Sequence, residues 1–78
     1  MAVKAYILVT VDTALTKQIV ATLRRNPRLK EVNEVLGPFD IIVEMEAPDL
    51  DGVTTALREE IRPIPGIRNT LTCVVMHS

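Results

Sequence analysis

The residue of this sequence with the clearest chemical potential is an aspartate at the start of an apolar run. Asp40 directly precedes the apolar residues 41–43, and the turn-forming pair Gly37 and Pro38 lies just before it, followed by Phe39. A carboxylate accepts hydrogen bonds from an ammonium group, and glycine lets the backbone come close to a ligand. The same carboxylate could instead cap the turn, so its role depends on the elements that position it.

Hydrophobic spacing divides the chain into four strands and two helices. We predict strands at residues 3–11, 32–36, 39–47 and 67–76, and helices at residues 14–25 and 49–61. This βαββαβ order predicts a ferredoxin-like α+β sandwich, in which an antiparallel four-stranded sheet carries both helices on one face. The 78 residues then form a single domain, residues 1–78.

Alternation of side chains along the strands assigns one sheet face to the helices and leaves the other uncovered. We expect the helix-facing residues to be Ala5, Ile7, Val9, Val11, Ile41, Val43, Met45, Leu71, Cys73 and Val75. The uncovered face then carries an apolar patch made of Tyr6, Leu8, Ile42, Val74 and Met76. Because exposed apolar patches mark interaction surfaces, we predict a homodimer formed through this face. Lys4 is expected to pair there with Glu44 or Glu46.

The predicted topology also brings polar side chains together at one edge of the uncovered face. Thr10, Asp40, Thr70 and Thr72 are expected to meet there, beside the backbone of Gly37. One carboxylate and several hydroxyl groups suit the ammonium and carboxylate of a free amino acid. The alternative is that Asp40 caps a turn or bonds Thr10, and the residue types by themselves leave both interpretations open.

Composition and charge exclude several classes of function. The net charge is −1, which steers the chain toward neither nucleic acid nor an anionic membrane. The one basic cluster, Arg24, Arg25, Arg28 and Lys30, is expected to be a solvated helix end and turn. No secretory signal or membrane-length apolar run is visible, so we expect a cytoplasmic protein. Nothing in the sequence indicates a cofactor.

An enzyme remains the second hypothesis, because small dimeric α+β barrels include oxygenases and isomerases. The only histidine, His77, lies next to the C-terminus, where chain ends usually fray. The only cysteine, Cys73, is expected to point into the core without a paired histidine. Glu44 and Glu46 could act as an acid and a base, but Lys4 offers them an ion pair instead. No metal-ligand spacing appears, so we predict no enzyme activity.

An ordered set of short motifs resembles the effector domain of Lrp/AsnC transcription regulators, also called the RAM domain. The resemblance rests on EVLGPFDIIVEMEAPDLDGV and IRPIPGIRNTLTCVV, and it covers essentially the whole chain. It includes Gly37-x-x-Asp40 after a strand, Asp49 and Leu50 at the start of the second helix, and IPGI before the last strand.

The resemblance implies a dimer that packs sheet against sheet and assembles further, into octamers or decamers. Amino-acid effectors bind between dimers in that family, close to the Gly-x-x-Asp loop. Carried over to this chain, the ligand-binding residues are Gly37, Pro38, Phe39, Asp40, Thr70 and Thr72, with Thr10 nearby. Phe39 stands where the family often has tyrosine, so a hydrogen bond from that position is lost.

The front of the chain departs from the family pattern. Family regulators begin with a helix-turn-helix DNA-binding domain, whereas here the first effector-domain strand follows Met1 and Ala2 directly. We therefore expect a stand-alone effector domain that does not bind DNA itself and that could modulate transcription through full-length regulators of the family. The third hypothesis is a purely structural oligomerisation module with the same interface and no ligand.

Overall fold

The strands and helices follow one another in the predicted βαββαβ order. The computed structural model describes residues 2–76. Its elements are strand β1 (Val3–Val11), the short 3-10 turn η1 (Thr13–Leu15), helix α1 (Thr16–Arg24), strands β2 (Leu29–Glu34) and β3 (Ile41–Ala47), helix α2 (Leu50–Ala56), its π-helical continuation η2 (Leu57–Ile61) and strand β4 (Ile67–Val74).

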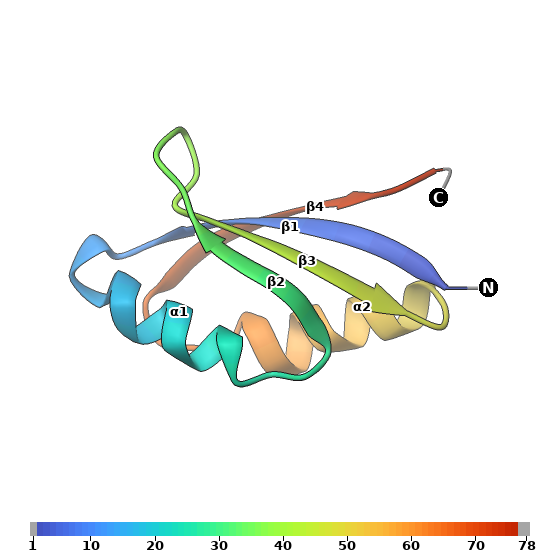
Figure 1. The fold of residues 1–78 in the computed structure, drawn as a ribbon. Coiled ribbons are helices and arrows are strands. Elements are labelled where there is room, and N and C mark those ends of the chain that lie inside the picture. The colour runs from blue at the N-terminus through green and yellow to red at the C-terminus, as the bar shows by residue number, and fades with distance from the viewer. Residues whose placement is uncertain (1, 77–78) are drawn as a thin grey trace.

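The four strands form one antiparallel sheet in the order β2-β3-β1-β4, with β1 and β3 at its centre. Both helices lie against the same face of this sheet, and the other face is uncovered (Figure 1). The arrangement confirms the predicted ferredoxin-like fold. It also leaves β2 and β4 as edge strands, each paired along one side only.

The core lies between the sheet and the helices, as the alternation predicted for the two central strands. The odd-numbered residues of β1 from Ala5 onward and those of β3 are buried, whereas the residues between them are partly or fully exposed. The helices contribute apolar stripes to the same layer. The largest fully buried side chains are Ile7, Ile19, Leu23, Ile41, Met45, Ile61, Val9, Val43 and Val53.

Local hydrogen bonds determine where the helices begin and how the last strand is entered. The Asp12 carboxylate accepts from the Ala14 N–H at 3.1 Å, and the Asp49 carboxylate accepts from the Gly52 N–H at 2.9 Å. Gly66 lies directly before β4 and has φ +97°, a conformation that other residues rarely adopt. A Cβ atom at Gly66 would also lie 2.7 Å from Leu15 Cδ1, so this turn requires glycine for two reasons.

Two predicted strand positions are wrong. The second strand is Leu29–Glu34 rather than 32–36, because the Leu29 N–H donates to Asn26 O in a tight turn and pairing then begins at once. Its last two predicted residues belong to a loop, and β3 begins at Ile41 rather than at residue 39. The β2–β3 loop therefore runs over residues 35–40 and stands away from the sheet (Figure 1).

The basic cluster near the end of α1 serves the fold. The Arg24 guanidinium donates twice to Val32 O, at 3.2 and 3.0 Å, and ties the helix to β2. Arg28 pairs with Glu60 at 3.1 Å and Lys30 pairs with Glu46 at 3.0 Å. Two of the four charges of the cluster, those of Arg28 and Lys30, are thus paired with carboxylates of the domain.

Candidate functional site

The β2–β3 loop is closed by a backbone bond at its base and is open at its tip. The Val35 N–H donates to Asp40 O at 2.9 Å, whereas Leu36 is fully exposed. A Cβ atom placed on Gly37 would meet nothing within 4 Å, and the φ of Gly37 is not positive. The fold of residues 2–76 therefore does not require glycine at position 37.

Asp40 joins the loop to the end of β1. Its Oδ2 accepts from the Val11 N–H at 2.9 Å, and its own N–H donates to Val9 O at 2.9 Å. Asp40 therefore does make a structural hydrogen bond, as the alternative interpretation expected, but the donor is the Val11 backbone rather than Thr10. The Thr10 hydroxyl instead lies 3.5 Å from Asn69 O. The second carboxylate oxygen of Asp40 has no hydrogen-bond partner among residues 2–76, which leaves it able to accept from a ligand.

The predicted cluster on the uncovered face does not form, because β4 has the opposite phase to the one expected. Thr70 pairs with Val9 and Thr72 pairs with Ile7, and directly paired residues share a face. Both threonines therefore lie on the helix side of the sheet, away from Thr10. A register shift between Thr10 and Val11 accompanies this pairing and is invisible in the sequence. The hydroxyl of Thr72 is buried without a partner in the described part of the chain.

Asp40 lines a different hollow, on the side of the β2–β3 loop that faces α1. This hollow has a volume of about 480 Å³ and lies between the β2–β3 loop and the start of α1. Lys17, Glu34 and Asp40 are the charged residues of its lining. The complete lining is Thr13, Ala14, Thr16, Lys17, Glu34, Val35, Leu36 and Asp40.

Groups of both charges in one hollow are suited to a zwitterion. A carboxylate can accept from the ammonium of an amino acid, and Lys17 can donate to its carboxylate. Sequence reasoning missed Lys17 and Glu34, because neither belongs to a motif. The signal that could have identified them is topological: the β1–α1 connection and the β2–β3 loop lie at the same end of the sheet.

The uncovered face carries the predicted apolar patch with a changed membership. Tyr6, Leu8 and Ile42 lie on it as expected, and the register adds Leu71 opposite Leu8 and Cys73 opposite Tyr6. Both added residues are exposed, so the expectation that they face the helices is wrong. Val74 pairs with Ala5 on the helix side, which removes it from the patch. Met76 lies beyond the end of β4 and is exposed, and the end position predicted for the strand is wrong by two residues.

The groups considered for catalysis have other surroundings. Glu44 pairs with Lys4 at 3.8 Å, as predicted, and Glu46 pairs with Lys30 across the β2–β3 edge. His77 lies outside the described residues. Within residues 2–76, no three His, Cys, Asp or Glu side chains gather in a way that could hold a metal ion. No helix of the described chain is long and apolar enough to cross a membrane.

Curated proteins similar to this chain include regulators and an enzyme. The HTH-type transcriptional regulator FL11 of Pyrococcus horikoshii is 29% identical over 72 residues, which are 92% of this chain and 47% of the regulator. Homocitrate synthase of Sulfurisphaera tokodaii is 36% identical over 64 residues, which are 82% of this chain but 13% of the enzyme. The chain thus spans about half the length of the regulator and a small part of the enzyme.

Solved structures match over nearly the whole fold. The crystal structure of FFRP-DM1 has a TM-score of 0.90 and 30% identity, and the match covers 95% of this chain and 99% of that one. The regulator NMB0573 of Neisseria meningitidis, solved as a complex with L-Met, has a TM-score of 0.88 and shares the fold at 14% identity, with 96% of this chain and 50% of that chain covered. The family model described as the Lrp/AsnC ligand binding domain matches residues 4–78. The chain therefore belongs to the Lrp/AsnC ligand binding domain family.

Proposed function

We propose that this domain senses a free amino acid in the hollow beside Asp40 and acts on transcription by changing how chains assemble. The observation that carries the proposal is the lining of that hollow, which combines the basic residue Lys17 with the acidic residues Asp40 and Glu34. Val35 and Leu36 add apolar surface for a ligand side chain. The complex of the Neisseria regulator with L-Met supports an amino acid as the ligand class.

The four residues of the loop from Gly37 to Asp40 have distinct roles in this proposal. Gly37 and Pro38 are exposed at the loop tip and Phe39 is half-buried, so the three can contact a ligand or a second chain. Asp40 holds the loop through Oδ2 and offers its other oxygen to the ligand ammonium. Thr70 and Thr72 lie on the other side of β1 from this loop, so we do not include them in this pocket.

Assembly is the output of the proposed sensor. A homodimer through the uncovered sheet face, with further association of dimers into octamers or decamers, would place the projecting β2–β3 loops near neighbouring chains. A ligand that contacts one assembly state more than another shifts the balance between them by that difference in binding free energy. The domain would act by joining full-length regulators of its family in mixed assemblies. The similarity to an HTH-type regulator supports that choice of partner.

A thermal-shift titration with each standard amino acid tests the sensor. One ligand or a small chemical class should raise the melting temperature, because ligand at 100 times its Kd stabilises the folded state by about 2.7 kcal/mol. Lys17→Gln and Asp40→Asn should each abolish the shift, since each keeps the size of the side chain and removes one charge. The matched control is Arg25→Gln, at the far end of α1, which should respond like the original protein.

Unchanged melting curves with every amino acid would overturn the sensor and favour the ligand-free oligomerisation module. A shift that survives in both Lys17→Gln and Asp40→Asn would place the binding site elsewhere. No described group favours catalysis, and the match to homocitrate synthase covers a small part of that enzyme. We therefore propose a non-enzymatic function for this domain.

A further inference from the structure

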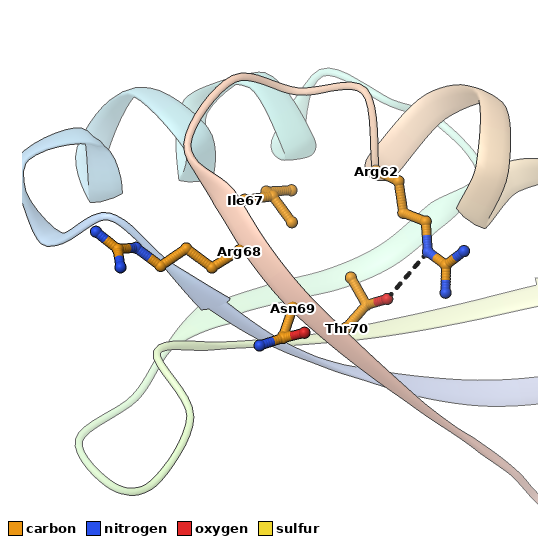
Figure 2. Close-up of a pocket in the computed structure, with 5 residues that line it drawn as sticks. All are labelled: Arg62, Ile67, Arg68, Asn69 and Thr70. Atoms are coloured by element: carbon orange, nitrogen blue, oxygen red, sulfur yellow. Dashed lines mark hydrogen bonds between the residues drawn. The ribbon is translucent and has the colours of Figure 1, made fainter.

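A second polar hollow lies on the opposite side of β1 from Asp40 and shares no lining residue with the first. It has a volume of about 290 Å³ and occupies the angle between the end of η2 and the start of β4. Figure 2 shows its lining: Arg62, Ile67, Arg68, Asn69 and Thr70. No carboxylate lines this hollow.

Arg62 is held in place by its backbone and by one side-chain bond. Its N–H donates to Leu57 O at 2.9 Å, and its Nε donates to Thr70 Oγ1 at 3.3 Å (Figure 2). The remaining guanidinium nitrogens form no hydrogen bond or ion pair within residues 2–76. The ion pairs of residues 2–76 involve Lys4, Arg28 and Lys30, so neither Arg62 nor Arg68 is neutralised by a neighbour.

Thr70 adds two donors beside this guanidinium. Its hydroxyl oxygen accepts from Arg62, so its own proton remains available to donate. The Val75 N–H donates to Lys4 O at 2.9 Å, so Lys4 and Val75 form a hydrogen-bonded pair between β1 and the residues that follow β4. Because bonded and non-bonded pairs alternate in an antiparallel ladder, the Val9–Thr70 pair is non-bonded. The Thr70 N–H therefore points away from β1, toward the free edge of the sheet.

We propose that this hollow binds the carboxylate of a small organic acid. The guanidinium, the hydroxyl and the outward N–H form a set of donors without a carboxylate of the chain to satisfy them, and arginine matches the planar fork of a carboxylate. Ile67 offers contact for a short apolar group. Arg68 extends away from Arg62 and adds positive charge at the far end of the hollow rather than a direct contact (Figure 2).

These donors should prefer a negatively charged carboxylate over a neutral group of the same shape. The site would therefore bind ligands other than those of the proposed amino-acid sensor. A carboxylic amide of the same shape carries no charge and brings its own N–H donors toward the guanidinium, so it should be rejected. An acid without an ammonium group needs neither Asp40 nor Glu34. The site thus extends the ligands of this domain from amino acids to simple carboxylates, and either proposal can fail without the other.

Nuclear magnetic resonance titration of the ¹⁵N-labelled full chain with sodium isobutyrate at constant ionic strength tests the proposal. The Thr70 amide and the Arg62 Nε–H resonances should shift saturably, with a Kd in the millimolar range. Arg62→Gln should weaken binding about tenfold, the loss expected for one charge-assisted hydrogen bond at a partly exposed site. Arg58→Gln removes an exposed arginine of the same helical segment and should bind like the original protein. Isobutyramide should produce no saturable shift.

A second variant and a second anion separate the alternatives. Thr70→Val keeps the β-branched shape and removes the hydroxyl, so it should weaken isobutyrate binding several-fold while circular dichroism shows an unchanged fold. The proposal is overturned if Arg62→Gln binds isobutyrate as tightly as the original chain, or if shifts grow linearly without saturation. It is equally overturned if inorganic phosphate binds more tightly than isobutyrate, because the site would then recognise a phosphate group.

Discussion

Gly37 and Asp40 lie three residues apart in one loop, yet the structure constrains them differently. Asp40 has a part-buried hydrogen bond to the Val11 N–H, so its carboxylate stabilises the end of β1 whether or not a ligand binds. Gly37 has open space around it and no unusual backbone conformation. The fold of the described chain therefore does not require glycine here, and its backbone freedom is lost on folding without a compensating contact.

Replacing the two loop glycines by alanine should have opposite effects on stability. Gly37→Ala should leave the free energy of unfolding unchanged or raise it by about 0.4–1 kcal/mol, because alanine restricts the unfolded chain. Gly66→Ala should lower it by more than 1 kcal/mol, since alanine at φ +97° is strained and its Cβ would contact Leu15. Urea unfolding measures both. A large loss in Gly37→Ala would mean that the fold itself requires glycine there.

If the loop forms the ligand site, Gly37→Ala should also reduce the amino-acid thermal shift while its fold persists. A response equal to that of the original chain would separate Gly37 from the ligand.

At the level of single elements, the sequence predicted helices and central strands better than it predicted β4. Helix α2 begins within one residue of its predicted start at residue 49, and Asp49 is its N-cap, which acts only on the nearest turn. The phase of β4 depended instead on partners far away in the chain. Leu71 and Cys73 are apolar, and the prediction placed them in the core, but the register with β1 turns them to the uncovered face. Apolar character alone could not distinguish a core from a surface that a second chain could cover.

Asp49→Ala tests how much the cap of α2 contributes. The Gly52 N–H would lose its acceptor, and the free energy of unfolding should fall by about 1 kcal/mol. For a domain of this size, that loss lowers the melting temperature by about 4–8 °C. Asp51→Ala is the matched control, because Asp51 is exposed in the first turn and contributes only through the helix dipole. Equal losses in the two variants would show that the cap adds nothing beyond its charge.

For the whole molecule, the uncovered face is the feature that the isolated chain leaves unexplained. Leu8 lies at its centre, opposite Ile42 on β3 and Leu71 on β4, with Tyr6 and Cys73 beside them. A second copy that packs its own sheet here would bury these side chains, and the largest gain comes from their apolar surface. The ion pairs of Glu44 and Glu46 lie around this patch and keep its border polar.

Leu8→Lys should break the proposed dimer. Burying an unpaired ammonium between two sheets is unfavourable, whereas the same side chain on a monomer remains in solvent. Light scattering at micromolar concentration should give at least twice the chain mass for the original protein and a markedly smaller mass for the variant. Ala21→Lys places the same charge on the exposed side of α1 and should leave the dimer intact. A chain mass of 8.7 kDa for the original protein at that concentration would rule out the sheet-to-sheet dimer.

The sequence by itself determined the order of elements, the buried stripes of β1, β3 and the helices, the start of α2 and the family. These features depend on neighbours within a few residues or on a regular period, which a linear pattern records directly. Only the tertiary structure decided which face Thr70 and Thr72 occupy, which backbone group Asp40 bonds, and that Lys17 and Arg62 each line a hollow. Those outcomes depend on register, including the shift between Thr10 and Val11, and on elements that approach from distant parts of the chain. A shift of one residue reverses the face of every side chain that follows it, and no local pattern specifies that shift.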